Sequence, residues 1–257
     1  MKIISYSDLH LEFGGRVTPA PEDAADLMVL AGDIITFRNF EPLAEFLRNW
    51  KKPVLYVAGN HEYYTQRDMM QEAAHFASWL ADEQPNVHFL QDEAVKIDGV
   101  NFFGGTMWTD FAGASQSAMA TAQGMMNDFR YIMSPAGRPL LPSETVRLHE
   151  IFVNKLLAWF EQDLQGPRVV ITHHAPVKNP DTKHGNSPLA PAFNSLDMVE
   201  IITRHQPELW IYGHTHECDN QLIGKTQIIS NQSGYPDGKG GYECEPFDEA
   251  GLMVEVN

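Results

Sequence analysis

Five short apolar runs, spread over most of the chain, each end in side chains that commonly bind metal ions, and no other feature of the sequence constrains the fold as strongly. The clearest is Leu209–Tyr212, an apolar run typical of a buried strand, which Gly213 ends and which His214 and His216 follow. Because residues two apart in an extended chain point to the same side, both imidazoles can face one point just beyond the strand. The five endings are, in chain order, Asp8 and His10, Asp33, Asn60 and His61, His173 and His174, and His214 and His216.

These endings hold six of the eleven histidines of the chain. In α/β sheets the ligand-binding crevice lies outside the carboxyl ends of the strands, so we expect the endings to meet at one edge. Residues 26–31 form a continuous apolar run, as in a strand covered on both faces, and residues 40–50 have the apolar spacing of a helix. The sequence therefore predicts a mixed α/β fold, and because it has no repeat or linker, one domain over residues 1–257.

Residues 105–142 are rich in Met, Ala, Gly and aromatic side chains and are predicted to form an inserted helical cap. Two interpretations remain open, and both can hold. The insertion is either a helical hairpin with a Met-rich core, or a cap over the pocket in which Trp108, Asp128 or Arg130 touches the substrate.

Local signals predict several further elements. Thr65 and Ser143 are each expected to cap a helix, and Leu196–His205 is expected to be a short helix. Hairpin turns are predicted at residues 98–99 and 224–225, and a lid loop at residues 177–191. Residues 231–235 are expected to form part of the pocket wall.

The net charge of 18 − 34 = −16 disfavours binding to long nucleic acids and to anionic membranes. It does not exclude a small phosphorylated ligand drawn in by bound metal. Only two cysteines occur, Cys218 and Cys244, which suits a reducing cytoplasm, and Cys218 is expected to be a buried, inert thiol. Neither a secretory signal nor a membrane span is predicted, so we expect a cytoplasmic protein. The sequence does not reveal the oligomeric state.

The mixture of ligand types points to particular metals. Imidazoles, carboxylates and one amide oxygen without thiolates suit Mn, Fe, Zn or Ni better than a structural zinc site. The candidate ligands are too many for one tetrahedral ion, and they suit two ions that share a bridging carboxylate.

The five endings resemble, in order, the signature blocks of the calcineurin-like metallophosphoesterases. The matching motifs are Asp8-Leu9-His10, Gly32-Asp33, Gly59-Asn60-His61-Glu62, His173 and Gly213-His214-Thr215-His216. The resemblance implies a metallo-dependent phosphatase-like fold, a four-layer α/β/β/α sandwich of two mixed sheets flanked by helices, with a dimetal site at the loop edge.

The same resemblance implies roles for individual residues. Asp8, His10 and His216 would hold one metal, Asn60, His173 and His214 the other, and Asp33 would bridge them. His174 adjoins His173, so the fourth block is ambiguous; we prefer His173 because it follows the strand directly. His174, Asn60 and Trp108 are the candidate substrate contacts, and Glu62 and Thr215 are expected to orient ligands.

The implied activity is hydrolysis of a phosphate ester by a hydroxide that bridges two divalent ions, with Asp33 and His61 as catalytic residues. His61 would protonate or stabilise the departing oxygen. Serine/threonine protein phosphatases carry an Asp-Arg-Gly run after the second block and purple acid phosphatases a metal-binding tyrosine, and this chain has neither, with Thr36 at the tyrosine position. A small-molecule or nucleotide phosphoesterase remains. Diesterase activity is favoured because no obvious basic cluster lies near the blocks to hold a dianionic monoester, and Arg38, Arg130 or Lys178 at the site would count against this. The alternatives are a phosphomonoesterase acting on a small metabolite and, from another class, a non-catalytic scaffold.

Overall fold

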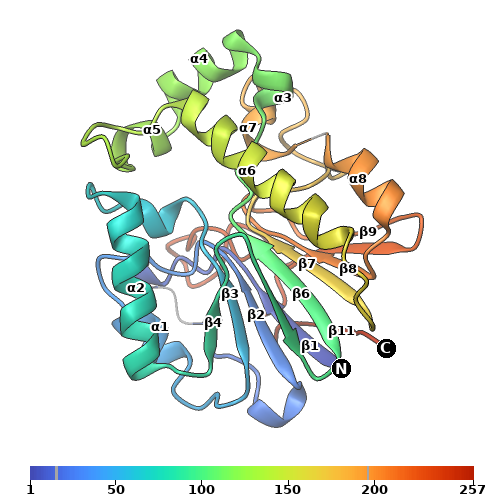
Figure 1. Cartoon of the computed structure of the whole chain (residues 1–257). Helices are drawn as coiled ribbons and strands as arrows, with labels where there is room; N and C mark the ends of the chain where they lie inside the picture. Colours follow the sequence, from blue (N-terminus) through green and yellow to red (C-terminus); the bar gives the residue numbers. More distant parts are fainter. Residues whose placement is uncertain (15–16, 196) are drawn as a thin grey trace.

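Two mixed β-sheets lie face to face with helices on their outer sides (Figure 1). A computed structural model describes residues 1–14, 17–195 and 197–257. The first sheet has the order β11 (Leu252–Glu255), β1 (Lys2–Tyr6), β2 (Leu27–Ala31), β3 (Val54–Val57) and β4 (Val87–Phe89). The second has the order β5 (Glu93–Ile97), β6 (Val100–Gly105), β7 (Arg168–Thr172), β8 (Leu209–Ile211), β10 (Thr226–Ser230) and β9 (Asp219–Ile223).

Most neighbouring strands are parallel. In the first sheet β1 to β4 run parallel and β11 is antiparallel to β1. In the second sheet β6, β7, β8 and β10 run parallel, and β5 and β9 are antiparallel edge strands. The carboxyl ends of the parallel strands in each sheet therefore meet at one edge, where the candidate ligands follow.

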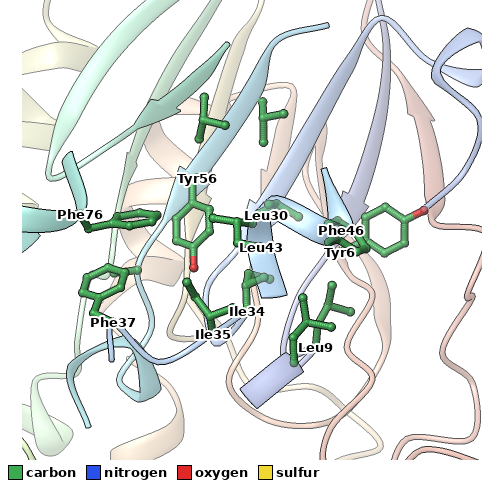
Figure 2. Close-up of a cluster of buried hydrophobic side chains, with 14 of the residues drawn as sticks. Tyr6, Leu9, Leu30, Ile34, Ile35, Phe37, Leu43, Phe46, Tyr56 and Phe76 are labelled. Atoms are coloured by element: carbon green, nitrogen blue, oxygen red, sulfur yellow. The ribbon is translucent and has the colours of Figure 1, made fainter. Parts of the chain in front are cut away.

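Alternation along the strands divides the core into layers. In β2, Leu27, Val29 and Ala31 pack between the two sheets, while Met28 and Leu30 pack under helices. Helices α1 (Glu41–Phe46) and α2 (Met69–Glu83) cover the first sheet, and Figure 2 shows Phe46 and Phe76 packed against it. Helices α6 (Pro142–Phe160) and α8 (Met198–His205) cover the second sheet. The four-layer α/β/β/α sandwich of two mixed sheets is thus confirmed.

The segment between β6 and α6 contains three short helices, α3 (Phe111–Ala114), α4 (Gln116–Met125) and α5 (Asp128–Tyr131). They lie beyond the ends of the sheets (Figure 1) and share a small apolar cluster with α7 (Ala190–Phe193). Met119 and Met126 pack against this cluster. That residues 105–142 act as a cap on a single domain stays a prediction.

Two predicted helix caps are wrong. The Thr65 hydroxyl accepts from the amide of Arg67 and so closes a turn of its own, and Asp68 caps α2 by accepting from the amides of Met70 and Gln71. Helix α6 begins at Pro142 rather than after Ser143, because the Glu144 side chain accepts from the amide of Leu141.

The two predicted hairpins are confirmed, since β5 pairs with β6 and β9 with β10 across residues 98–99 and 224–225. The predicted start of α8 at Leu196 lies outside the described residues. In the described part of the chain, no helix combines the length and the apolar character that crossing a bilayer requires.

Candidate metal centre

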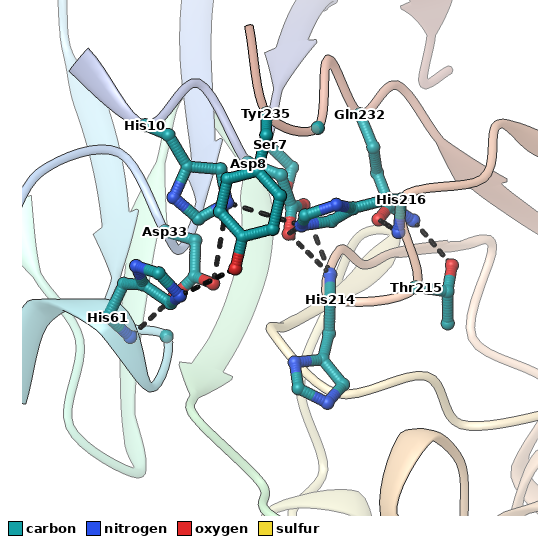
Figure 3. Close-up of polar contacts among 12 residues, drawn as sticks. Ser7, Asp8, His10, Asp33, His61, His214, Thr215, His216, Gln232 and Tyr235 are labelled. Carbon is teal, nitrogen blue, oxygen red and sulfur yellow. Dashed lines mark hydrogen bonds and ion pairs between the residues drawn. The ribbon is translucent and has the colours of Figure 1, made fainter. Parts of the chain in front are cut away.

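The loops that follow β1, β2, β3, β7 and β8 converge at one edge of the two sheets (Figure 3). Several of the side chains they carry sit on left-handed backbone, which is uncommon outside glycine and clusters at functional sites. The residues and their φ angles are Asp8 at 54°, His10 at 44°, Asp33 at 54°, His214 at 75° and His216 at 51°. Packing of the surrounding core holds these loops in conformations that the chain alone disfavours.

One group of ligand atoms consists of Asp8, His10 and His216, which lie close enough together to hold a metal ion. The Nε2 atoms of His10 and His216 are 3.2 Å apart, and the Nε2 atom of His216 is 3.6 Å from Oδ1 of Asp8. Asp8 and His10 are fully buried. Two imidazoles and a carboxylate thus face one point.

A second group consists of Asp33, His173 and His214, with Asn60 beside it. The Asn60 Oδ1 atom is 3.1 Å from His173 Nε2 and 3.1 Å from His214 Nδ1. The two imidazole nitrogens are themselves 3.2 Å apart.

Asp33 lies between the two groups. Its Oδ1 atom is 3.4 Å from His173 Nε2, and its Oδ2 atom is 3.9 Å from His10 Nε2. One carboxylate oxygen therefore faces each group, which is the placement that a bridging ligand needs.

The hydrogen bonds on the outer sides of the imidazoles fit a metal centre. The Nδ1 atoms of His10, His173 and His216 contact acceptors, namely Glu12 at 3.3 Å, the Ala31 carbonyl at 3.0 Å and Glu243 at 2.6 Å. These acceptors hold a proton on Nδ1, so the Nε2 lone pairs turn inward, as in metal-ligating histidines. Lone pairs that face each other at such distances repel unless a proton or a cation lies between them. The donor set therefore fits two divalent cations.

Burial and neighbouring charges shift the pKa values of side chains in and beside the second group. Burial alone would raise the pKa of Asp33, but the positive charges of His173 and His61 lower this pKa well below its usual range. Burial alone would lower the pKa of His173, but the Asp33 carboxylate raises it to about 10. Burial, together with the neighbouring His173, lowers the pKa of His174 to about 3. The cluster without metal thus concentrates a proton on the His173–Asp33 pair.

His61 lies beside both groups, and each of its ring nitrogens contacts another side chain. Its Nδ1 atom is 3.2 Å from Oε1 of Glu12, and its Nε2 atom is 3.0 Å from the hydroxyl of Tyr235. Its backbone amide donates to Oδ1 of Asp33. Tyr235 lies within the predicted pocket wall of residues 231–235, whereas Glu12 was not among the predicted residues.

Glu62 forms hydrogen bonds with the loops that follow β2 and β3. It is fully buried, and its carboxylate accepts from the amides of Gly59, Asp33 and Ile34 and from the hydroxyl of Tyr56. These contacts support the ligand-orienting role expected from the sequence. Thr215 instead accepts a hydrogen bond from the Gln232 amide.

Gly213 is required by close packing. A Cβ atom at this position would lie 2.6 Å from Oδ2 of Asp8 and 2.9 Å from the carbonyl oxygen of Ala31. No side chain therefore fits between β8 and the loop that carries Asp8.

A cavity of about 270 Å³ opens onto the two groups. Its lining residues are Asp33, Asn60, His61, Tyr64, Met126, Asn127, Asp128, His184, Phe193, His214, Thr215, His216, Tyr235 and Glu243. No lysine or arginine lines it among the residues that the structure describes. A larger cavity of about 830 Å³, lined by Leu11, Gly14, residues 17–22 and α1 with the residues that follow it, holds none of the predicted ligands.

The structure does not bring Trp108 or His174 to the cavity wall. Trp108 is buried and packs on Tyr63 and His174. The Nδ1 atom of His174 contacts the Thr106 carbonyl, and its ring packs on that of His214 with the ring centroids 4.1 Å apart. Between the two adjacent histidines, His173 is the one that faces Asn60 and Asp33. Asp128 lines the cavity, but the guanidinium of Arg130 donates to the carbonyl of Gly124.

The two cysteines are neighbours in space. Both are free thiols, Cys244 is buried and Cys218 half-buried, and their sulfur atoms are 3.5 Å apart. The expectation of a buried thiol thus fits Cys244 better than Cys218.

Known proteins resemble this chain in sequence and in fold. A family model described as calcineurin-like phosphoesterase matches residues 1–218. A protein of Acanthamoeba polyphaga mimivirus that is named only as uncharacterized is 27% identical over 271 residues, which cover 91% of this chain and 92% of that protein. A UPF0046 protein of Caenorhabditis elegans is 27% identical over 241 residues, which cover 90% of this chain and 69% of that protein.

Among solved structures, the crystal structure of the phosphopantetheinyl hydrolase of Mycobacterium tuberculosis has the same fold. Its TM-score is 0.70 at 20% sequence identity, over 91% of this chain and 90% of that one. Tyr235 and Glu243 lie beyond the part of this chain that the family model matches.

Proposed function

Because the chain belongs to the calcineurin-like phosphoesterase family and is thus a metal-dependent phosphoesterase, we propose that it hydrolyses a small-molecule or nucleotide phosphodiester with two divalent metal ions. The observation that carries this proposal is the position of Asp33, with one carboxylate oxygen toward each group of imidazoles.

In this proposal the ligands divide as the geometry groups them. One ion would be held by Asp8, His10 and His216, and the other by Asn60, His173 and His214, with Asp33 available to both. The facing ring nitrogens and the acceptors behind them support this division. Mn, Fe, Zn and Ni all suit this donor set.

Bound divalent cations supply Lewis-acid polarisation of phosphoryl oxygens and acidify water for attack on phosphorus. The residues of the chain supply orientation and proton transfer. His61 lines the cavity, and its Nε2 atom lies beside the Tyr235 hydroxyl. The Glu12 carboxylate accepts a hydrogen bond from Nδ1 of His61. We propose that protonated His61 donates a proton to the departing oxygen, a role typically worth about 10²–10⁴-fold in rate.

The charges around the cavity favour a diester over a monoester. Asp128 and Glu243 line the wall, and no lysine or arginine does so in the described part of the chain. A phosphomonoester carries close to two negative charges near neutral pH and a diester only one. Glu243 forms an ion pair with Lys183 at 3.0 Å, whereas Asp128 has no lysine or arginine partner among the described residues. A wall lined by carboxylates and by no lysine or arginine therefore repels the diester less.

The test is hydrolysis of paired chromogenic substrates, p-nitrophenyl phosphate and bis(p-nitrophenyl) phosphate, by protein loaded with Mn, Fe, Ni or Zn. Cyclic nucleotides, dinucleotides, glycerophosphodiesters and a phosphopantetheinyl ester complete the panel. The last is included because the structurally similar protein from Mycobacterium tuberculosis is named for hydrolysing such a group.

We expect a higher kcat/KM for the diester, loss of activity in metal-stripped protein, and recovery when metal is returned. A higher kcat/KM for the monoester would replace the diesterase by a phosphomonoesterase. Equal rates in holoprotein and in protein shown metal-free by elemental analysis would refute the mechanism. No hydrolysis of any phosphoester with two metals bound would favour a scaffold.

A further inference from the structure

The side-chain amide of Asn60 is held from both ends. Its Oδ1 atom faces His173 and His214, at 3.1 Å from each. On the other side, its Nδ2 group donates to Oδ1 of Asp128 at 2.9 Å and contacts the hydroxyl of Tyr64 at 3.2 Å. An asparagine amide has one acceptor end and one donor end of similar shape, and only the acceptor end binds a cation. The partner on the donor side therefore decides which end faces the metal group.

Asp128 is the partner that selects the orientation of the Asn60 amide. The Oδ1 atom of Asp128 accepts the hydrogen bond from Asn60, so it selects the NH₂ end of that amide and rejects the carbonyl end. The Tyr64 hydroxyl also donates to the Asp128 carboxylate. Asp128 is only 2% exposed, and no lysine or arginine forms an ion pair with it within the residues described. Burial of a carboxylate without a lysine or arginine partner is costly, which points to a specific role for it.

Asp128 also comes from a different part of the fold than the metal ligands. It is the first residue of α5, in the inserted segment between β6 and α6, whereas Asn60 follows β3 (Figure 1). The contact spans 68 positions in the sequence and joins the insertion to the metal group.

We propose that Asp128 is a positioning residue for the second metal ion, since its carboxylate turns the Asn60 carbonyl oxygen toward the site that His173 and His214 complete. The inference rests on the dimetal site proposed above and deepens it. The inserted segment then has a function besides the predicted one of covering the cavity, because docking of α5 completes one of the two metal sites. The other site, formed by Asp8, His10 and His216, has no contact with Asp128.

The variant Asp128→Asn tests this directly. Its amide can present a donor or an acceptor to Asn60, so the orientation of Asn60 is no longer selected. Loss of a partner that orients a metal ligand typically weakens metal binding by about 10–100-fold. We expect Mn²⁺ titration calorimetry, with elemental analysis of the loaded protein, to show two tight ions in the parent protein. The variant should keep one tight ion and bind the second about 10–100-fold more weakly.

The matched control is Asp110→Asn. Asp110 belongs to the same inserted segment and caps α3 by accepting from the amides of Ala112 and Gly113. Its replacement perturbs the segment by a similar change of charge, but it should leave both ions bound. Thermal unfolding of each variant reports whether the fold is kept, and Asp128→Ser provides a second reading if Asp128→Asn does not fold.

An exchange of the two side chains separates orientation from general damage. Asn60→Asp combined with Asp128→Asn reverses the hydrogen bond, with the amide now donating from position 128 and a carboxylate oxygen facing the imidazoles. We expect this double variant to bind the second ion more tightly than Asp128→Asn alone.

The inference is overturned if Asp128→Asn binds both ions as tightly as the parent, or if it and Asp110→Asn lose both ions together. A parent protein that does not bind two ions would instead overturn the dimetal proposal on which the inference rests.

Discussion

Glu62 provides a sharp test of how the metal centre is held together. The Oε2 atom of its buried carboxylate accepts from the amides of Gly59 at 2.7 Å and Asp33 at 3.0 Å. Its Oε1 atom accepts from the amide of Ile34 at 2.9 Å and from the hydroxyl of Tyr56 at 2.6 Å. The variant Glu62→Gln keeps the size of the side chain but replaces one acceptor with an NH₂ donor.

The magnitude follows from the best orientation of the new amide. With NH₂ in place of Oε1, the Tyr56 hydroxyl can rotate and accept, but the Ile34 amide then faces a donor, at a cost of about 1–3 kcal/mol. The bonds from Gly59 and Asp33 lose the strengthening that an ionised acceptor gives, about 1 kcal/mol each. Loss of the charge offsets part of this, because burial and the nearby Asp33 raise the pKa of Glu62 to about 7. We expect a net destabilisation of about 2 kcal/mol.

For a chain of this length, such a change lowers Tm by about 4–8 °C. The assay is thermal unfolding in the presence of a chelator, followed by Mn²⁺ titration, in which the variant should bind metal about 10–100-fold more weakly. The control Tyr56→Phe removes one donor and leaves three backbone amides on the carboxylate, so its metal affinity should be unchanged. A Glu62→Gln protein that melts within about 1 °C of the parent and binds metal equally well would refute the reasoning.

Three further outcomes are expected. His61→Ala should lower kcat by about 10²–10⁴-fold while elemental analysis still finds two ions, and loss of an ion would contradict its role at the leaving group. Gly213→Ala should abolish tight Mn²⁺ binding, because the added carbon meets Asp8 and the backbone of Ala31, and an unchanged titration would contradict this. Burial alone would lower the pKa of His173, but the Asp33 carboxylate outweighs it and raises this pKa to about 10. A metal ion must therefore displace a proton from His173, so the metal affinity should rise with pH up to about 10. Calorimetry in two buffers of different ionisation enthalpy should show proton release, and buffer-independent heats would argue against it.

The convergence of the candidate metal ligands could be predicted because it depends on local rules. Apolar runs such as Leu27–Ala31 mark parallel strands, and the carboxyl ends of such strands share one edge, so Asp33 and its counterparts had to converge. The preference for His173 over His174 rested on one local observation, that His173 follows the strand directly. Adjacent residues in an extended chain point to opposite sides, and only the position of Asn60 shows which side is the site.

Glu62 was expected to orient ligands, but the contacts of Asp128 and Glu243 with the candidate ligands could not be predicted because these partners are remote in sequence. Asp128 contacts Asn60 across 68 positions, and Glu243 contacts His216 across 27. Neither carboxylate differs in sequence from an ordinary surface acid. The cap predicted at Thr65 failed because hydroxyl side chains also close local turns, as Thr65 does with the amide of Arg67. Ser143 lies inside α6, which begins at Pro142 and where Glu144 accepts from the amide of Leu141.

The most direct test of the dimetal site is anomalous scattering from crystals of the protein loaded with Mn²⁺ or Zn²⁺. Our account predicts two anomalous peaks, one beside Asp8, His10 and His216 and the other beside Asn60, His173 and His214, with Asp33 in contact with both. A single peak at saturating metal, or peaks that Asp33 does not touch, would contradict it.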